Sequence, residues 1–380
     1  MLFAPESLAK MRHNLRWLPS WLWQSSRRSS ARAGTVHLII GIANHFEPSI
    51  LPDRPGESAD QQEQERRMAD WCRKYPNVAG EWRDSNGHPF RQTYFSPAEQ
   101  YHKNLIECLA EHCRDGWGEI EIHLHHGVRA PDTAANTRRT LVEFRDRLAA
   151  HGCLARLAAD ASPRYAFVHG NWALANSDGG RCCGVDGELQ ILAETGCYAD
   201  LTMPSAPHST QVSKINSLYE CAGPLNRRAP HRRGRDLRCG CPPSKFPLMI
   251  QGPLTLSFCN KKRAWPFVRI ENSELSAANP PTLGRLRLWQ NTQIRVAGRP
   301  DWLFLKLHCH GLDPRDRDCL LGEPLSRFLR DLVAGARLDG KRRIHFVTAR
   351  EMVNLALAAC DGREGNPGDY RDYRLKPLRA

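Results

Sequence analysis

The segment Glu121-Ile-His-Leu-His-His126 sets the expected fold, together with a second segment of the same design, Leu305-Lys-Leu-His-Cys-His310. Each has the pattern of a strand that ends in histidines. Alternate residues of a strand point to the same face, so the histidines two positions apart in each segment project together. If both strands lie in one sheet, four imidazole nitrogens converge. Zinc and similar ions favour neutral imidazole and, in catalytic sites, keep a position free for water, so the two segments indicate a metal-dependent hydrolase.

Outward from these segments, apolar strand patterns alternate with longer helical patterns from Thr35 onward, which indicates a parallel α/β architecture. Polar residues follow several strands at their carboxyl ends, where (β/α) barrels carry their active sites. Seven predicted strands with intervening helices favour one barrel over two domains. The predicted strands are 36–43, 120–124, 165–169, 197–201, 248–256, 302–307 and 344–347, and the predicted helices are 97–113, 134–151, 187–195, 282–291, 324–334 and 349–359.

The pattern divides the chain into three regions. A basic, Trp-rich segment (1–34) precedes a barrel (35–360), and a polar tail (361–380) follows it. Two insertions interrupt the barrel, a long polar one at 48–96 and a basic loop rich in Pro and Gly at 223–245. The basic loop is either solvated or binds a phosphate, pyrophosphate or carboxylate group of a substrate.

Composition limits the class of partner and the compartment. The chain has 380 residues, 41% of them hydrophobic, which is enough for a large core, and its net charge of +13 favours an anionic partner. It has neither an RNA-binding aromatic signature nor a helix-turn-helix pattern, so no specific nucleic-acid partner is predicted. The 14 cysteines are scattered rather than set in a compact framework, which indicates reduced thiols. Without an 18-residue apolar stretch or the apolar core of a secretory signal, a cytoplasmic location is expected.

The N-terminal segment has two interpretations. Trp17, Trp21 and Trp23 are flanked by Arg16 and other arginines. A basic segment with tryptophans suits the headgroup layer of a membrane, so residues 12–28 are a candidate peripheral membrane contact. In the alternative, a short helix packs its aromatic side on the domain.

The order of the strand ends resembles the polysaccharide deacetylase (carbohydrate esterase) superfamily over roughly residues 36–356. In that family an acidic pair ends the first strand, histidines end the second, a substrate-lining motif ends the third, and a later strand supplies another histidine. The resemblance implies a distorted (β/α)7 barrel of the α/β class. The segments that match are 44–47, 123–126, 169–172 and 308–310, with 191–204 resembling a helix-Gly-aromatic-Asp passage of the family.

This sequence departs from the family pattern at two points. The family usually presents two aspartates at the first strand end, where this chain has Asn44, His45 and Glu47. The family also separates two metal-binding histidines by three residues, whereas the histidines of 123–126 are closer together. The departures imply either a rearranged set of metal ligands or a barrel whose metal chemistry is weakened or lost.

The chemistry of acetamide hydrolysis suggests roles for these residues. The reaction needs an activated water, a positive partner for the oxyanion and an acid for the leaving amine, and a metal can supply the first two. A divalent metal, zinc in the first instance, is the expected cofactor. The predicted metal ligands are His45, His125 and His126, with His123 next. The predicted catalytic residues are Glu47 as general base, His308 or His310 as general acid, and Asp200 to orient that histidine.

The segment His169-Gly-Asn171-Trp172 is interpreted as a sugar-lining segment. Its glycine allows close backbone approach, an indole can stack on a sugar face, and an amide can bind hydroxyl groups. The alternative is a tight turn that carries a core tryptophan. Glu188 is expected in the first turn of a helix, where a carboxylate favours the positive end of the dipole.

The expected function is removal of acetyl groups from an N-acetylated sugar in cell-surface polysaccharide or lipopolysaccharide metabolism. The substrate would be a carbohydrate, anionic or lipid-linked. One alternative is a glycoside hydrolase, which needs two acids about 5–10 Å apart, such as Glu47 with Glu188 or Asp200. Another is a glycan- or membrane-associated barrel that binds without catalysis.

Overall fold

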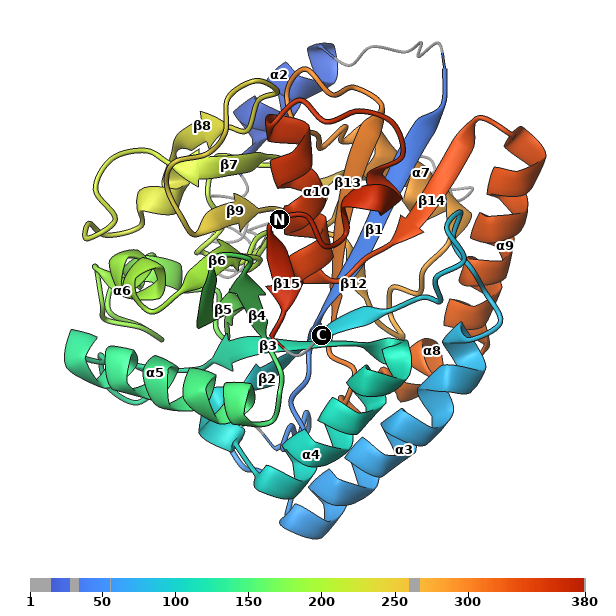
Figure 1. The fold of residues 1–380 in the computed structure, drawn as a ribbon. Coiled ribbons are helices and arrows are strands. Elements are labelled where there is room, and N and C mark those ends of the chain that lie inside the picture. Colours follow the sequence, from blue (N-terminus) through green and yellow to red (C-terminus); the bar gives the residue numbers. More distant parts are fainter. Residues whose placement is uncertain (1–14, 28–33, 55, 260–266, 379–380) are drawn as a thin grey trace, which may run out of the picture.

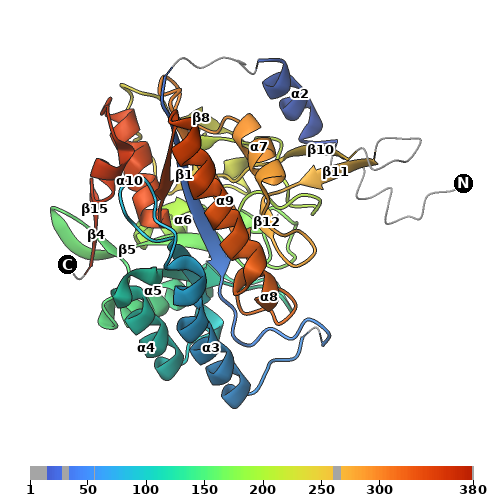
Figure 2. The same cartoon turned by 90° about the vertical axis from the view of Figure 1, so that its right-hand side faces the viewer.

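The computed structural model describes residues 15–27, 34–54, 56–259 and 267–378 (Figure 1, Figure 2). Its helices are α2 (Leu18–Ser26), α3 (Gln61–Ala79), α4 (Lys103–His112), α5 (Ala134–Ala150), α6 (Glu188–Glu194), α7 (Leu283–Asn291), α8 (Arg317–Leu320), α9 (Glu323–Asp339) and α10 (Ala349–Cys360). Its strands are β1 (Val36–His45), β2 (Gln92–Pro97), β3 (Gly118–Leu124), β4 (Ala155–Leu157), β5 (Asp160–His169), β6 (Cys197–Asp200), β7 (Leu218–Cys221), β8 (Gly234–Asp236), β9 (Leu248–Ile250), β10 (Thr255–Cys259), β11 (Phe267–Glu271), β12 (Glu274–Leu275), β13 (Trp302–Cys309), β14 (Arg342–Phe346) and β15 (Leu375–Pro377).

One large sheet organises these elements. Its strands follow the order β12-β13-β1-β2-β3-β5-β6-β9-β7-β8, while β14 pairs with β1, and β4 pairs with both β5 and β15. Pairing is parallel from β12 to β9 and antiparallel where β7 joins β9 and β8. The carboxyl ends of β1, β2, β3, β5 and β13 therefore meet at one edge, which carries the histidines.

The predicted (β/α)7 barrel is wrong, because the sheet is a curled, mostly parallel half-barrel. A closed barrel needs its two end strands to pair with each other. Among the described residues, β12 pairs only with β13, and β8 pairs only with β7. Side chains alone fill a barrel of eight strands. Here the inner face also holds α10, whose twelve residues are all buried, and a helix is about 10–12 Å across, so the sheet stays open (Figure 1).

The two faces of β1 belong to different cores. Leu38, Ile40 and Ile42 pack with residues of α3, α4 and α9 on the outer face. Ile39 and Ala43 pack with residues of α10 on the inner face. A strand buried on both faces explains the continuous apolar run at the start of this strand, a pattern typical of parallel sheets.

The predicted polar insertion at 48–96 contains a helix that packs on the outer face of the sheet and most of a strand that lies within it. Helix α3 begins at the N-cap Asp60, whose carboxylate accepts a hydrogen bond from the Glu63 amide, and its buried side includes Trp71 and Tyr75. Strand β2 then enters the sheet between β1 and β3. The end of β2 consequently contributes to the histidine edge.

The N-terminal helix α2 packs on the domain beside the hairpin of β10 and β11 (Figure 2). Trp17 is fully buried in a small core with Ala206, Ile215 and Leu254. The indole N–H of Trp21 donates to Thr255 Oγ1 at 2.8 Å. The described part of the 12–28 segment thus packs as the second interpretation expected, and residues 12–14 and 28 lie outside the described residues. No helix in the described ranges has the length and apolarity needed to cross a bilayer.

Two candidate metal sites at the carboxyl edge of the sheet

Two clusters of side chains at this edge have the composition of metal sites. The Glu47 group consists of Glu47, His123 and His125, and the Glu188 group consists of His126, His169, Cys183 and Glu188. Within each group the ligand atoms lie within 4.8 Å of one another.

Adjacent residues of a strand point to opposite faces, and this alternation sends His125 and His126 to different groups. Ile122 and Leu124 of β3 face the outer core, so His123 lies on the inner face. His125 lies beside His123, with a ring separation of 4.6 Å. The next residue, His126, points instead toward Glu188, which α6 supplies. The structure therefore groups His123 with His125, as predicted, and places His126 in a different cluster.

Glu47 lies at the centre of its group. Its Oε1 is 3.1 Å from His125 Nε2 and 3.8 Å from His123 Nε2. The Nδ1 of His123 donates to the Val168 carbonyl at 2.8 Å, and Nδ1 of His125 is bonded to Glu99 Oε1 at 2.6 Å. A histidine that donates through Nδ1 presents a lone pair at Nε2 when neutral, which is the tautomer that binds metals.

Three further histidines surround the Glu47 group. His310 Nδ1 donates to the second oxygen of Glu47, Oε2, at 2.7 Å. The ring of His45 lies 4.9 Å from that of His123, 4.8 Å from that of His310 and 6.2 Å from that of His308. Three of the predicted histidines, His123, His125 and His310, thus contact the Glu47 carboxylate. His45 and His308, at the ends of β1 and β13, lie next to them.

The charge of Glu47 is balanced by the histidines around it. Burial opposes ionisation, but hydrogen bonds from three histidines hold the pKa of Glu47 well below its usual value. Burial likewise opposes the charged form of His125, yet Glu47 and Glu99 raise its pKa to about 10. Burial lowers the pKa of His123 and of His45. Without an ion, protonated histidines balance the charge of Glu47, and an ion bound at His125 Nε2 would displace a proton from that nitrogen.

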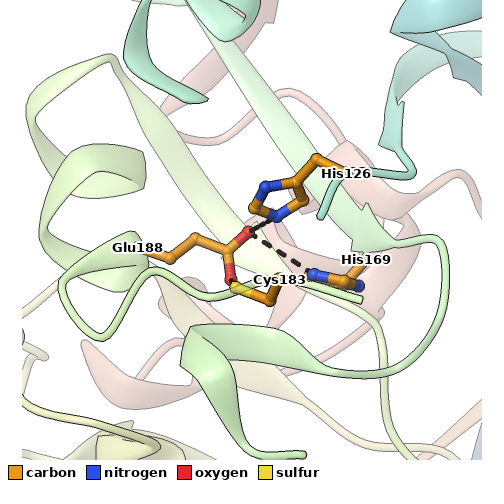
Figure 3. A group of neighbouring side chains, drawn as sticks. All are labelled: His126, His169, Cys183 and Glu188. Atoms are coloured by element: carbon orange, nitrogen blue, oxygen red, sulfur yellow. Dashed lines mark hydrogen bonds and ion pairs between the residues drawn. The ribbon is translucent and has the colours of Figure 1, made fainter. Parts of the chain in front are cut away.

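The Glu188 group is a compact set of four side chains (Figure 3). Glu188 Oε1 lies 2.9 Å from His126 Nε2 and 3.8 Å from His169 Nε2. The thiol of Cys183 lies 3.6 Å from Glu188 Oε2, which also accepts the Ala175 amide at 2.6 Å.

Burial distinguishes the Glu188 group from the Glu47 group. The side chains of His169 and Glu188 are completely buried, and that of His126 is 5% exposed. In spite of this burial, which favours the neutral acid, His169 and His126 lower the pKa of Glu188 to about 2. Burial lowers the pKa of His169 to about 3, whereas the attraction of Glu188 overcomes burial and raises that of His126 to about 11. The metal-free group is thus a buried ion pair with one neutral histidine.

The predicted role of Asp200 is wrong. Its carboxylate accepts hydrogen bonds from the amide and hydroxyl of Thr202, at 3.1 and 2.8 Å, and not from His308 or His310. The Thr202 hydroxyl oxygen in turn accepts the His169 amide at 2.9 Å. Burial raises the pKa of Asp200 to about 7 and lowers that of Lys306 to about 7. Asp200 therefore supports the backbone beneath His169.

The segment predicted to line a sugar site lies directly beside the Glu47 group. A methyl group added at Gly170 would come within 2.2 Å of the His125 ring, so only glycine fits there. Asn171 and Trp172 follow on the same turn, and the Trp172 ring lies 5.3 Å from that of His208. His169 itself belongs to the Glu188 group rather than to this surface.

Glu99 and Cys183 were not predicted as site residues, and Glu188 was predicted to have a different role. Glu99 follows β2, a strand that was not predicted, and this position at a strand end is the signal that would have marked it. Cys183 carries no local signal, because it lies in a loop that only the fold brings to Glu188. Glu188 was assigned to the first turn of a helix, and it does begin α6, but its side chain faces the histidines.

Comparison with known proteins adds no relatives: neither a scan against protein-family models nor a search of the curated proteins gives a match. The function is therefore argued from the geometry of the two groups.

Proposed function

We propose that this chain is a metal-dependent amide hydrolase that removes the acetyl group from an N-acetylated sugar. A divalent ion, zinc in the first instance, would be held by Glu47, His123 and His125. The single observation that carries the proposal is the orientation of the two histidines. Both aim Nε2 at the same carboxylate oxygen while a carbonyl and a carboxylate occupy their Nδ1 atoms. Such outer partners are typical of metal-binding histidines.

The Glu47 group also has the accessibility that a catalytic site requires. The side chain of His125 is 21% exposed, and those of His310 and Glu99 are 26% and 33% exposed. Three protein ligands with a solvent-facing side leave a coordination position for water. An ion bound here would lower the pKa of that water and polarise the acetyl carbonyl.

His310 is the proposed general acid, which protonates the leaving amine. Burial disfavours its charged form, but the hydrogen bond to Glu47 raises its pKa, so its protonated form persists toward neutral pH. In the reaction, water adds to the acetyl carbon and the carbon–nitrogen bond breaks. The imidazolium of His310 gives its proton to the departing amine, and the acetic acid that forms returns a proton to His310 and leaves as acetate.

A sugar is favoured by the surface beside the ion site. The turn after β5 brings Asn171 and the half-buried Trp172 next to His125, through the close contact of Gly170. An indole offers a face for a sugar ring, and the amide offers hydrogen bonds to hydroxyl groups.

An anionic group on the sugar would suit a neighbouring pocket. The chain runs from His208, whose ring contacts Trp172, into a pocket of about 380 Å³ lined by Arg16, Ser209 and Arg232. No carboxylate within the described ranges forms an ion pair with either arginine. Guanidinium groups without such partners favour phosphate or carboxylate ligands.

The test is metal content and acetate release measured on the same purified protein. We expect bound metal, acetate release from N-acetylated saccharides, and loss of that release after chelation. The variant His125→Ala should lose the activity, while His88→Ala, a half-buried histidine outside both groups, should keep it. A folded protein whose acetate release survives His125→Ala would overturn the proposal, and one that binds no metal would indicate a binding protein.

A further inference from the structure

We infer that the Glu188 group is a second metal site, distinct from the proposed catalytic one, that holds a zinc-class ion permanently as part of the fold. Its ligands would be His126 Nε2, His169 Nε2, Cys183 Sγ and a carboxylate oxygen of Glu188 (Figure 3).

The spacing of the four side chains already approaches that of a tetrahedral ion. Zinc binds nitrogen and oxygen at about 2.0–2.2 Å and sulfur at about 2.3 Å, which places tetrahedral ligand atoms about 3.3–3.8 Å apart. Glu188 Oε1 lies 2.9 Å from His126 Nε2 and 3.8 Å from His169 Nε2, and its other oxygen, Oε2, lies 3.6 Å from Cys183 Sγ. The contacts of both oxygens are thus close to the tetrahedral spacing, and all four ligand atoms lie within 4.8 Å of one another.

The buried polar atoms of the group are incompletely satisfied without an ion. His169 Nε2 is completely buried, points into the group and has no hydrogen-bond partner among the described residues. A buried polar atom without a partner destabilises the folded state. A metal at the centre would pair this nitrogen, the thiolate of Cys183 and the carboxylate of Glu188 together.

The loop that carries Cys183 is built to hold its position. A methyl group on Gly127 would come within 2.2 Å of the Cys183 carbonyl oxygen, and one on Gly184 within 2.6 Å of Pro131. Both glycines have positive φ, of 63° and 92°, which other residues rarely adopt. The Cys183 carbonyl also accepts the Asp132 amide at 2.7 Å. The sulfur is thus fixed by backbone contacts from the segment that follows His126.

One histidine of the group has the outer partner expected of a metal ligand. His126 Nδ1 is bonded to Asp132 Oδ2 at 2.9 Å, which leaves Nε2 for an ion. His169 differs, because its Nδ1 accepts the Asn171 amide at 3.2 Å. A metal at Nε2 puts the proton on Nδ1, so this long hydrogen bond must open when the ion binds.

The enclosure of the group indicates a structural rather than a catalytic ion. Four protein ligands complete a tetrahedron and leave no position for water, which is the pattern of structural zinc sites. Histidine and thiolate together favour zinc over magnesium or calcium. Cobalt(II), which accepts the same geometry, serves as a probe because a cobalt–thiolate bond produces an intense near-ultraviolet absorption.

The experiment loads the chelator-treated full-length chain with zinc or cobalt(II) and compares Cys183→Ala with Cys182→Ala, a neighbouring half-buried cysteine outside the group. We expect two zinc ions per chain, reduced to one by Cys183→Ala and unchanged by Cys182→Ala. The thiolate absorption of the cobalt protein should disappear only in Cys183→Ala. Glu188→Gln should weaken metal binding at this site at least about tenfold.

The outcome is separable from that of the proposed function. His125→Ala should remove the other ion and leave the thiolate absorption intact. If Cys183→Ala keeps both ions, or if the cobalt protein shows no thiolate absorption, the second site does not exist, whatever the acetate assay gives. If the absorption is present but no acetate is released, this inference stands and the deacetylase proposal fails.

Discussion

The Glu47 group and the Glu188 group both combine histidines with a carboxylate, but they differ in the exposure of one histidine and in the presence of a cysteine. In the Glu47 group the histidines are oriented by Val168 and Glu99, and His125 is one-fifth exposed. In the Glu188 group the carboxylate is completely buried and a cysteine completes the set. Residue type alone therefore does not distinguish a reactive ion site from a structural one. Access to solvent and the number of ligands do.

The largest expected difference between the groups is in activity. His125→Ala should lower kcat/KM for acetate release by at least about 10³-fold, because metal activation of water would be lost. Cys183→Ala should instead lower the melting temperature, since a bound structural ion stabilises the folded state. Parallel assays of acetate release and thermal unfolding check both. Equal loss of activity in the two variants with no change in melting temperature would refute the division of roles.

His310→Gln tests the proton-transfer step within the Glu47 group. Its kcat should fall by about 10²-fold or more, the usual contribution of a general acid, while metal content stays the same. The pH–rate profile should lose the limb that reports a protonated group. A variant that keeps the wild-type profile would show that another residue protonates the amine.

Glu99 and Asp132 hydrogen-bond to Nδ1 of one histidine in each group, so metal affinity can be reduced at each group separately. Glu99→Gln should reduce metal affinity at the Glu47 group about 10–100-fold, and Asp132→Asn should do the same at the Glu188 group only. Competition with a metal-binding dye resolves the two affinities, and cobalt absorption identifies the thiolate site. Cross-effects of equal size would mean that the two clusters form one site.

The metal-free protein should show a smaller, pH-dependent difference. The pKa of Glu188 is lowered to about 2, so its contribution to stability is present above about 4.5 and is lost as the pH falls toward 2. The pKa of His126 is raised to about 11, so its contribution is present below about 6.5 and is lost as the pH rises toward 11. The loss of either charge should lower the free energy of unfolding by about 1.5–3 kcal/mol, the usual contribution of a hydrogen bond to a charged group.

Urea unfolding in chelator at acidic, neutral and alkaline pH measures this dependence. Glu188→Gln should flatten both limbs of the stability profile. Glu194→Gln changes an exposed acid of the same helix and is the matched control. An unchanged acid limb in Glu188→Gln would show that the buried pair does not contribute to stability.

Much of the sheet could be predicted because apolar runs mark buried parallel strands, as in β1 and β13, and because apolar residues alternate along β3. Strand β2 could not, because Gln92–Pro97 is short and half polar, and its place between β1 and β3 depends on contacts far apart in sequence. Whether the sheet closes into a barrel also cannot be predicted from any one segment. The strands that end the sheet and the helix on its inner face decide it, so the barrel prediction failed although most of its strands exist.

The candidate site divides in the same way. The pairing of His123 with His125 follows from a period of two along one strand, and the structure has it. The same period of two predicts that His126 points away from His123 and His125. The prediction of His125 and His126 as ligands of one ion did not take this into account. Cys183 reaches its group from a loop and Glu99 from a short 3-10 helix (Ala98–Gln100), and no spacing within the sequence relates them to the histidines.

The peptide bond between His125 and His126 joins the two groups. This unit is planar, so the Cα atoms of the two histidines are held about 3.8 Å apart. The contact of Gly170 with the His125 ring limits how far the pair can move. If both proposed sites bind ions, any coupling between them would run through this peptide unit, and by thermodynamic reciprocity each ion would then change the affinity for the other by the same factor. Filling the buried site during folding would set the position of His125 before any substrate arrives.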